Sequence, residues 1–176
     1  MPRIRWKTGL RLSLAVLLSV PFVPGAYAAS PLNADARADS VVVLKKERKL
    51  ILYSQGQMLK TYSISLGIVP VGPKTRQGDH KTPEGHYLLD RRNPNSHYYR
   101  SIHISYPTPE QIEIAKKRGV SPGGDVFIHG LPNGFGWLGS TQLASDWTEG
   151  CIAVTNREMD EIWRAVPDGT PIEIKP

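Results

Sequence analysis

The 176-residue sequence predicts a mainly β fold with a few short helices. Short runs rich in Val, Ile, Leu and Tyr recur along the chain and are separated by Gly, Pro and charged clusters, a pattern typical of strands and turns. Only two stretches, 108–119 and 155–166, combine a helix cap with helical spacing. We therefore expect a domain built mainly from strands.

Residues 1–28 are predicted to form a cleavable signal peptide. Four basic residues precede the apolar stretch LSLAVLLSVPFV, and Ala26-Tyr27-Ala28 has the small-x-small form of a cleavage site. A retained membrane anchor is the weaker alternative, because the stretch is shorter than the roughly 20 residues of a bilayer span and is broken by Pro21. Export, to a periplasm, is the expected outcome.

The rest of the chain is predicted to be one domain, 40–176, behind a linker at 29–39. The linker sequence ASPLNADARAD is small and polar, and the segment 40–176 has the length of a single core. The formal net charge of +6 includes the four basic residues of the signal peptide. The domain itself is therefore close to neutral, which argues against nucleic acid as its ligand.

Strands are expected first. The segment VVVLKKERKLILYSQGQMLKTYSISLG predicts three strands separated by KKERK and SQGQ. After a loop-rich segment, another strand is expected at about 86–89. RSIHIS alternates with period two, which places Ile102 and Ile104 on one face.

Two helices are predicted from their caps. In TPEQIEIAKKRG, Thr108 suits the N-cap and Pro109 the first helical position. In the second helix, Thr155 and Glu158 have the spacing of a capping box, and an apolar stripe that runs to Val166 is expected to pack on the core. TPIEIK then closes the domain as a strand.

Cys151 is the single cysteine and the first candidate for chemistry. It cannot form an internal disulfide, so in an oxidising compartment it is either hidden or chemically useful. A free thiol has a pKa near ~8.5 and needs a base or a cation to attack a carbonyl at neutral pH. Histidine is the usual helper, and the chain has five: His80, His86, His97, His103 and His129.

Position favours His129 as the base. DVFIHG predicts a buried strand that ends at His129, and CIAVT predicts a strand that starts at Cys151. If the two strands pair antiparallel, the two side chains meet at one edge of the sheet. The long connection 130–150 is expected to be functional or to carry its own structure. Its aromatic side chains would suit the wall of a substrate groove or would plug the core: Phe135, Trp137 and Trp147.

Two glycines flank the pair. Gly150 would let the backbone approach a substrate and aim N–H groups at an oxyanion. The Gly130 carbonyl could fix the tautomer of the imidazole, as the third member of a triad does. A metal is the rival use for the histidines, but they lack the paired spacing of a zinc motif, so we expect no metal and no cofactor.

FIHG, a long loop and TEGCIAVTN together resemble the signature of the L,D-transpeptidase catalytic domain (YkuD) family. In that family a histidine and a glycine precede a Ser/Thr-His-Gly-Cys element that ends near an asparagine. LYSQGQMLKTYSISLG, GDHKTPEGHY and HISYP are similar to the family's opening strands and substrate-side loop. The resemblance covers about residues 40–175 and implies a β-sandwich-like fold.

The resemblance also implies a mechanism. Cys151 would be the nucleophile and His129 the general base and acid, with the Gly130 carbonyl orienting the imidazole and backbone N–H groups near Gly150 and Cys151 forming the oxyanion hole. The substrates would be peptidoglycan stem tetrapeptides. Release of D-alanine would leave a thioester, and the side-chain amine of a second stem would resolve it into a 3→3 cross-link.

The sequence departs from the family pattern in two places. Glu149 stands where the family usually has histidine, and Ala153 stands where an arginine often follows. DWTEGC is similar to a branch of the family that includes a hydrolase detaching lipoprotein from murein. Glu149 would repel a carboxylate-rich donor, select an amine acceptor, or be a solvated loop acid.

Two alternative functions remain open from the sequence. The same catalytic dyad of Cys151 and His129, with water as acceptor, would act as an amidase or L,D-carboxypeptidase, including one that releases murein-linked lipoprotein. A different class is a murein-binding module in which Cys151 is an inert core residue.

Overall fold

The computed structural model describes residues 31–176. The signal peptide predicted at 1–28 lies outside the described residues. Among residues 31–176, no helix is long and apolar enough to cross a membrane.

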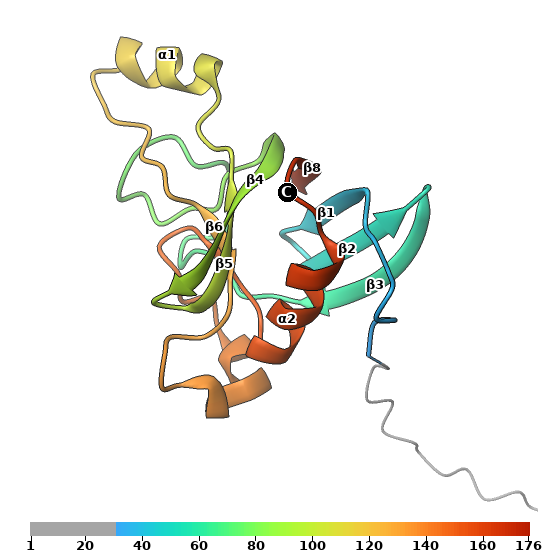
Figure 1. Cartoon of the computed structure of the whole chain (residues 1–176). Coiled ribbons are helices and arrows are strands. Elements are labelled where there is room, and N and C mark those ends of the chain that lie inside the picture. The colour runs from blue at the N-terminus through green and yellow to red at the C-terminus, as the bar shows by residue number, and fades with distance from the viewer. Residues whose placement is uncertain (1–30) are drawn as a thin grey trace, which may run out of the picture. The chain divides into compact units, whose positions relative to one another are not determined.

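The domain is organised around one sheet of eight strands in the order β3-β2-β1-β8-β4-β5-β6-β7 (Figure 1). β8 connects the two groups of strands, β3-β2-β1 and β4-β5-β6-β7, since it pairs parallel with β1 and antiparallel with β4. The strands are β1 (Ser40–Leu44), β2 (Lys49–Ser54), β3 (Gln57–Ser63), β4 (Gly85–Ser96), β5 (Tyr99–Ile104), β6 (Phe127–His129), β7 (Ile152–Ala153) and β8 (Thr170–Lys175).

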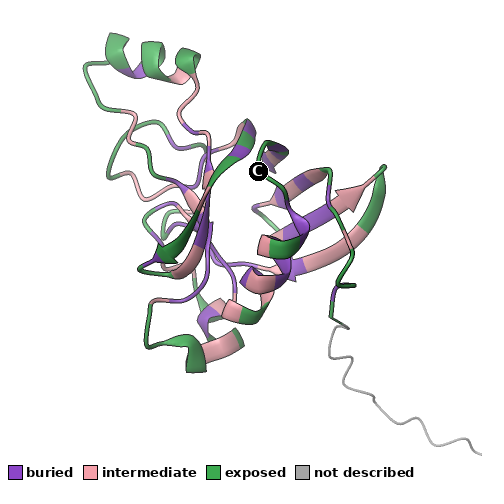
Figure 2. Ribbon diagram, viewed as in Figure 1, coloured by how far each residue is buried: buried purple, intermediate pink, exposed green. Residues whose placement is uncertain are grey.

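The sheet curls around helix α2 (Asn156–Ala165), which lies between the β2–β3 side and the β5–β6 side (Figure 1). The buried face of α2 joins Ile102 of β5 and Leu52 of β2 in one apolar core. Buried residues accordingly line the inner surfaces of both sides (Figure 2). The prediction of a mainly β fold with short helices is confirmed.

Both predicted helices begin at their predicted caps. Thr108 caps α1 (Pro109–Lys117) in a capping box with Gln111, and Thr155 caps α2 in a capping box with Glu158. A third helical segment, the 3-10 segment η1 (Gly136–Ala144), lies inside the long connection 130–150. That connection thus carries structure of its own.

The part of the predicted linker that the structure describes is not a free tether. Leu32 and Ala38 are buried in the core, and the Ala38 N–H donates to the Ala165 carbonyl at 2.8 Å. A polar, small-residue composition predicted a linker here, but two apolar side chains suffice to hold the segment on the domain.

The expected antiparallel pairing of the two site strands is wrong. β6 and β7 are parallel, with Ile128 opposite Ile152 and His129 opposite Ala153. Parallel neighbours need a crossover connection, and residues 130–150 with η1 provide it. Cys151 directly precedes β7 and, by the alternation of side chains, lies on the same face as Ala153 and His129.

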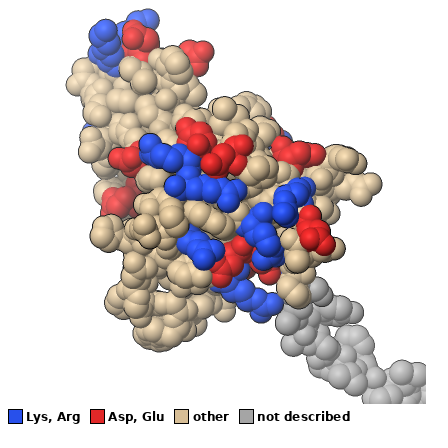
Figure 3. Space-filling model, viewed as in Figure 1, with Lys and Arg blue, Asp and Glu red and all other residues tan. Residues whose placement is uncertain are grey.

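Charged side chains of both signs adjoin on the face drawn in Figure 3. Charged side chains of residues 31–176 also form ion pairs, including Arg92 with Asp168 at 2.7 Å and Arg48 with Asp146 at 2.7 Å. This mixed surface agrees with the nearly neutral domain expected from the sequence.

Candidate active site

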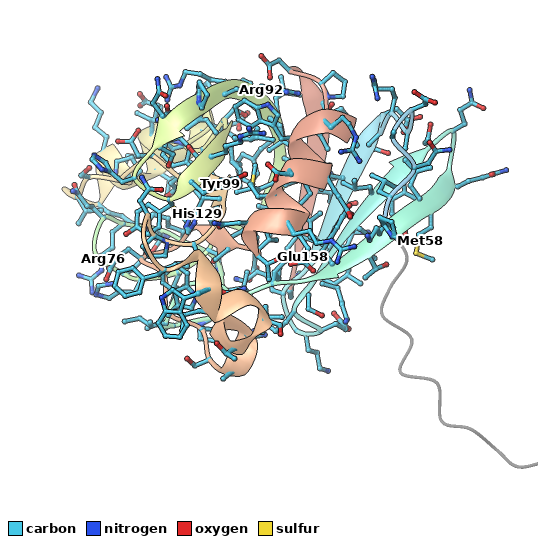
Figure 4. The ribbon with its side chains drawn as sticks, turned by 60° about the horizontal axis from the view of Figure 1, so that its bottom comes forward. Met58, Arg76, Arg92, Tyr99, His129 and Glu158 are labelled. Atoms are coloured by element: carbon cyan, nitrogen blue, oxygen red, sulfur yellow. The ribbon has the colours of Figure 1, made fainter. Side chains whose placement is uncertain are left out.

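His129 and Cys151 line one cavity of about 430 Å³. Two aromatic rings also line it and pack on the imidazole: the ring centroid of Tyr98 lies 4.6 Å and that of Trp147 5.7 Å from the centroid of His129. In Figure 4, His129 lies on the same side of α2 as Arg76, and Met58 on the opposite side. The site therefore belongs to the β5–β6–β7 side of the sheet.

His129 is held in one tautomer. Its ring is buried, with 4% of the residue exposed, and Nδ1 lies 2.6 Å from the Gly130 carbonyl oxygen. A carbonyl only accepts, so Nδ1 carries the proton and Nε2 is the basic nitrogen. Burial lowers the pKa of His129 to about 4, and the bond to Gly130 opposes that shift. At neutral pH the imidazole is uncharged.

The Cys151 thiol is partly buried, and burial raises its pKa above the ordinary value. A hydrogen bond from the Phe127 backbone and the charge of Lys74 lower this pKa, whereas the charge of Asp125 raises it. The Asp125 carbonyl lies 3.7 Å from Sγ. The resting site thus holds a neutral thiol and a neutral imidazole in one cavity, and the thiolate forms only when a proton moves.

Gly150 is required by close packing. Its φ is +127°, and a Cβ added there would lie 2.6 Å from the Lys81 carbonyl oxygen. Its N–H donates to Thr148 Oγ1 at 3.1 Å. The sequence had led us to expect this N–H at an oxyanion, but the bond to Thr148 already uses it. Thr148 Oγ1 donates in turn to the Cys151 carbonyl at 2.7 Å, which holds the turn before the thiol.

Cys151 also lines a second cavity, of about 590 Å³. Its wall is polar and includes Lys74, Gln77 and Ser121. Asp125 and Glu149 border both cavities. The two cavities therefore share Cys151 and two acidic residues.

Glu149 contacts His80 through its Oε2 and the His80 Nδ1. The Glu149 side chain remains 76% exposed and that of His80 39% exposed. Position 149 thus holds a surface carboxylate paired with a histidine from another loop.

The other predicted candidates are scattered. His97 also lines the cavity of the dyad, whereas His103 pairs with Asp90 at 2.7 Å and His86 lies 3.7 Å from Glu173. Among the aromatics, Trp147 lines that cavity.

Phe135 and Trp137 are 51% and 78% exposed and do not line either cavity at the thiol. Residues 31–176 contain no cluster of three or more His, Cys, Asp or Glu side chains arranged to hold a metal ion.

Sequence reasoning missed three side chains of the site: Lys74, Tyr98 and Asp125. Each lies in a loop or at a strand end, where no periodicity predicts its direction. Asp125 has a φ of +53°, a conformation that costs energy in non-glycine residues and is common at functional sites. Only the tertiary structure reveals that signal.

Known proteins share this fold and part of this sequence. YafK of Escherichia coli (strain K12) is 34% identical over 132 residues, which cover 72% of this chain and 46% of YafK. YkuD of Bacillus licheniformis is 24% identical over 144 residues, which cover 82% of this chain and 70% of YkuD. The chain spans about half the length of the first of these relatives.

A solved structure extends the likeness. The helical cell shape determining protein Pgp2 of Campylobacter jejuni superposes with a TM-score of 0.57 at 26% identity, over 80% of this chain and 48% of that protein. The family model of the L,D-transpeptidase catalytic domain, YkuD, matches residues 38–174. The chain belongs to the L,D-transpeptidase catalytic domain family.

Proposed function

We propose that the protein is a peptidoglycan L,D-transpeptidase that works through a thioester on Cys151. The observation that carries the proposal is the hydrogen bond from His129 Nδ1 to Gly130, in a cavity that the thiol shares. That bond commits one ring nitrogen and leaves Nε2 as the base. An inert core cysteine would need no such partner.

Acylation begins from the neutral pair. As Sγ attacks the carbonyl carbon between the third residue of a stem tetrapeptide and its terminal D-alanine, the thiol proton passes to His129 Nε2. The C–N bond then breaks, and the imidazolium returns the proton to the departing amine. The Cys151 N–H is the backbone donor that we assign to the oxyanion, because the Gly150 N–H already donates to Thr148.

Deacylation reverses the roles. The side-chain amine of a second stem attacks the thioester carbon, His129 takes a proton from that amine, and Sγ leaves as the thiol after the proton returns. The products are a 3→3 cross-link and the free enzyme. Burial lowers the pKa of His129 to about 4, below the neutral range in which a general base works best, so the proton transfer from Sγ requires stabilisation of the thiolate that it leaves.

The two cavities support a reaction with two substrates. One cavity is walled by Tyr98 and Trp147, and the other is polar, so the donor stem and the acceptor are expected to approach the thiol from different sides. The carboxylates of Asp125 and Glu149 stand between them and would attract a cationic amine. This arrangement favours an amine over water as acceptor.

The test is to incubate the purified protein with sacculi and to analyse the muropeptides by mass spectrometry. New 3→3 dimers that are absent with Cys151→Ala support transfer. Loss of existing links, of D-alanine or of bound lipoprotein without new dimers identifies the hydrolase alternative, which uses the same dyad. Identical muropeptide profiles for the protein and for Cys151→Ala would leave only murein binding.

Export and cell-wall location belong to the same proposal. The substrate is extracytoplasmic, and the predicted signal peptide at 1–28 would deliver the domain to it. The likeness to a protein that determines helical cell shape is consistent with a role in wall remodelling. Fractionation of cells that express the full chain tests the location. The N-terminus of the exported protein is expected to be Ala29, after cleavage behind Ala28.

A further inference from the structure

Lys74 and Asp79 form a buried ion pair at the base of the loop 74–81. Their side chains are 5% and 7% exposed, and Lys74 Nζ lies 2.9 Å from Asp79 Oδ1. The Arg76 carbonyl accepts a second bond from Nζ at 3.2 Å. Burying an ammonium is costly, so a lysine in such a place requires a physical reason.

Asp79 also organises the loop. Its carboxylate accepts backbone N–H groups from Thr75, Arg76 and Lys81 at 2.7, 3.0 and 3.2 Å. These bonds lower the pKa of Asp79, although burial opposes them. The carboxylate is thus ionised and saturated with donors, and it holds the Lys74 ammonium in place.

This loop packs directly on the backbone that carries the nucleophile. A Cβ added at Gly150 would lie 2.6 Å from the Lys81 carbonyl oxygen and 3.9 Å from Lys74 Nζ. Lys74 also lines the second cavity together with Cys151. The ammonium therefore stands beside the residue that precedes the thiol and shares a cavity with it.

A second buried lysine shows what a purely structural arrangement looks like. Lys45 is 2% exposed, and its Nζ donates to Gly72 O, Thr82 O and Glu84 Oε1 at 2.8, 3.1 and 2.7 Å. Three acceptors thus use all three of its N–H donors. Lys74 has two acceptors, and within residues 31–176 its third N–H has none.

We propose that Lys74, held by Asp79, stabilises the anion that develops at Cys151 when the thiol proton passes to His129. The catalytic role that this inference gives to Lys74 rests on the proposed function. A positive charge near the thiol favours the thiolate, and the Lys74 ammonium is in place before the proton moves, while the buried imidazole of His129 is still uncharged.

Other titratable groups line the two cavities that include Cys151 or pair with residues that line them, and the test must separate Lys74 from these groups. These groups are His129 in β6, Asp125 before β6, Glu149 before β7, His97 in the turn after β4, and Asp79 and His80 in the loop 74–81. Of these, the negative charge of Asp125 opposes Lys74 at the thiol.

The experiment measures the rate of alkylation of Cys151 by iodoacetamide against pH in the folded, full-length protein. Lys74→Met should raise the apparent pKa of the thiol by about one pH unit, which means about tenfold slower alkylation at a fixed pH below that pKa. Lys74→Arg should restore most of the rate. Lys45→Met, which also breaks a buried ion pair, should leave the pKa of the thiol unchanged.

A folded Lys74→Met protein with an unchanged thiol pKa would overturn the proposal. If that variant does not fold, Asp79→Asn and the double variant Asp79→Asn/Lys74→Met replace it: the thiol pKa must be higher in the double variant than in Asp79→Asn. The titration needs no substrate. Inactivity of the unaltered protein on sacculi would therefore remove the proposed function, whereas an unchanged thiol pKa would remove only the role of Lys74.

Discussion

The two sides of the sheet differ in how they use their polar groups. On the β3-β2-β1-β8 side, the strands have five to seven residues and bond to one another along their length. On the other side, β4 has twelve residues and β5 six, but the two strands at the site are short: β6 has three residues and β7 two. The first side is held by ladders along whole strands, whereas at the edge of the second side β6 and β7 pair over only two or three residues, next to the cavities.

The same contrast separates the two buried lysines. Lys45 donates all its N–H groups to acceptors of the protein. One N–H of Lys74 has no acceptor within residues 31–176, and its ammonium lies beside Gly150 and lines a cavity with Cys151. Substitutions on the first side should therefore change the free energy of unfolding. Matched substitutions at the site should also change the reaction rate or the pKa of the Cys151 thiol.

The largest expected effect is on the rate. His129→Asn keeps a side-chain N–H near the Gly130 carbonyl but removes the basic Nε2, so acylation should slow by about 10³-fold. The rate of thioester formation with a tetrapeptide, followed by intact-mass spectrometry, measures this. A variant that retains more than a tenth of the rate would exclude His129 as the base.

The next effect compares two glycines with positive φ. Gly150→Ala should cost about 3 kcal/mol or more, because the new Cβ meets a backbone carbonyl at 2.6 Å in addition to the strain of a φ of +127°. Gly56→Ala in the β2–β3 turn has a φ of +74° but no atom within 4 Å, so it should cost about 1 kcal/mol. Urea denaturation of both variants measures the difference, and equal costs would contradict the close packing at Gly150.

Protonation of His129 should make the free energy of unfolding of the protein depend on pH. The folded pKa is about 4, and the unfolded value is the ordinary 6.5. Between these values the unfolded chain binds the proton and the folded chain does not, so the free energy of unfolding falls as the pH falls from 6.5 to 4. The full loss from this group is about 3 kcal/mol.

His129→Asn supplies the control for that prediction, since asparagine does not titrate. The difference in unfolding free energy between the unaltered protein and this variant should change with pH across the same window. A difference that stays constant from pH 7 to pH 4 would show that the buried imidazole is not the group responsible.

The smallest effect is expected at Glu149. Because this carboxylate is 76% exposed, Glu149→Gln should change the unfolding free energy by less than about 1 kcal/mol. Asp146→Asn is the matched control, since Asp146 is 14% exposed and accepts bonds from Arg48 and from the Leu66 N–H. It should cost about 2 kcal/mol. Thermal melts of the two variants give the comparison.

Local signals in the sequence were sufficient for most of the fold. The caps at Thr108 and Thr155 and the alternation at Ile102 and Ile104 depend on neighbouring residues alone, and each corresponds to an observed element. The direction of β7 was not predictable, because a two-residue strand carries no pattern that distinguishes parallel from antiparallel pairing. The packing of Leu32 on the core likewise depends on partners far along the chain.

For the site, the sequence by itself determined which residues have the required chemistry: a single thiol, a histidine at a strand end and glycines beside both. Their types and order also carried the family resemblance. Only the tertiary structure decided that the site strands run parallel, that the Gly150 N–H is already bonded and that Lys74 lies next to Gly150. These features depend on loops whose paths are set by contacts between distant segments, and no local propensity encodes such contacts.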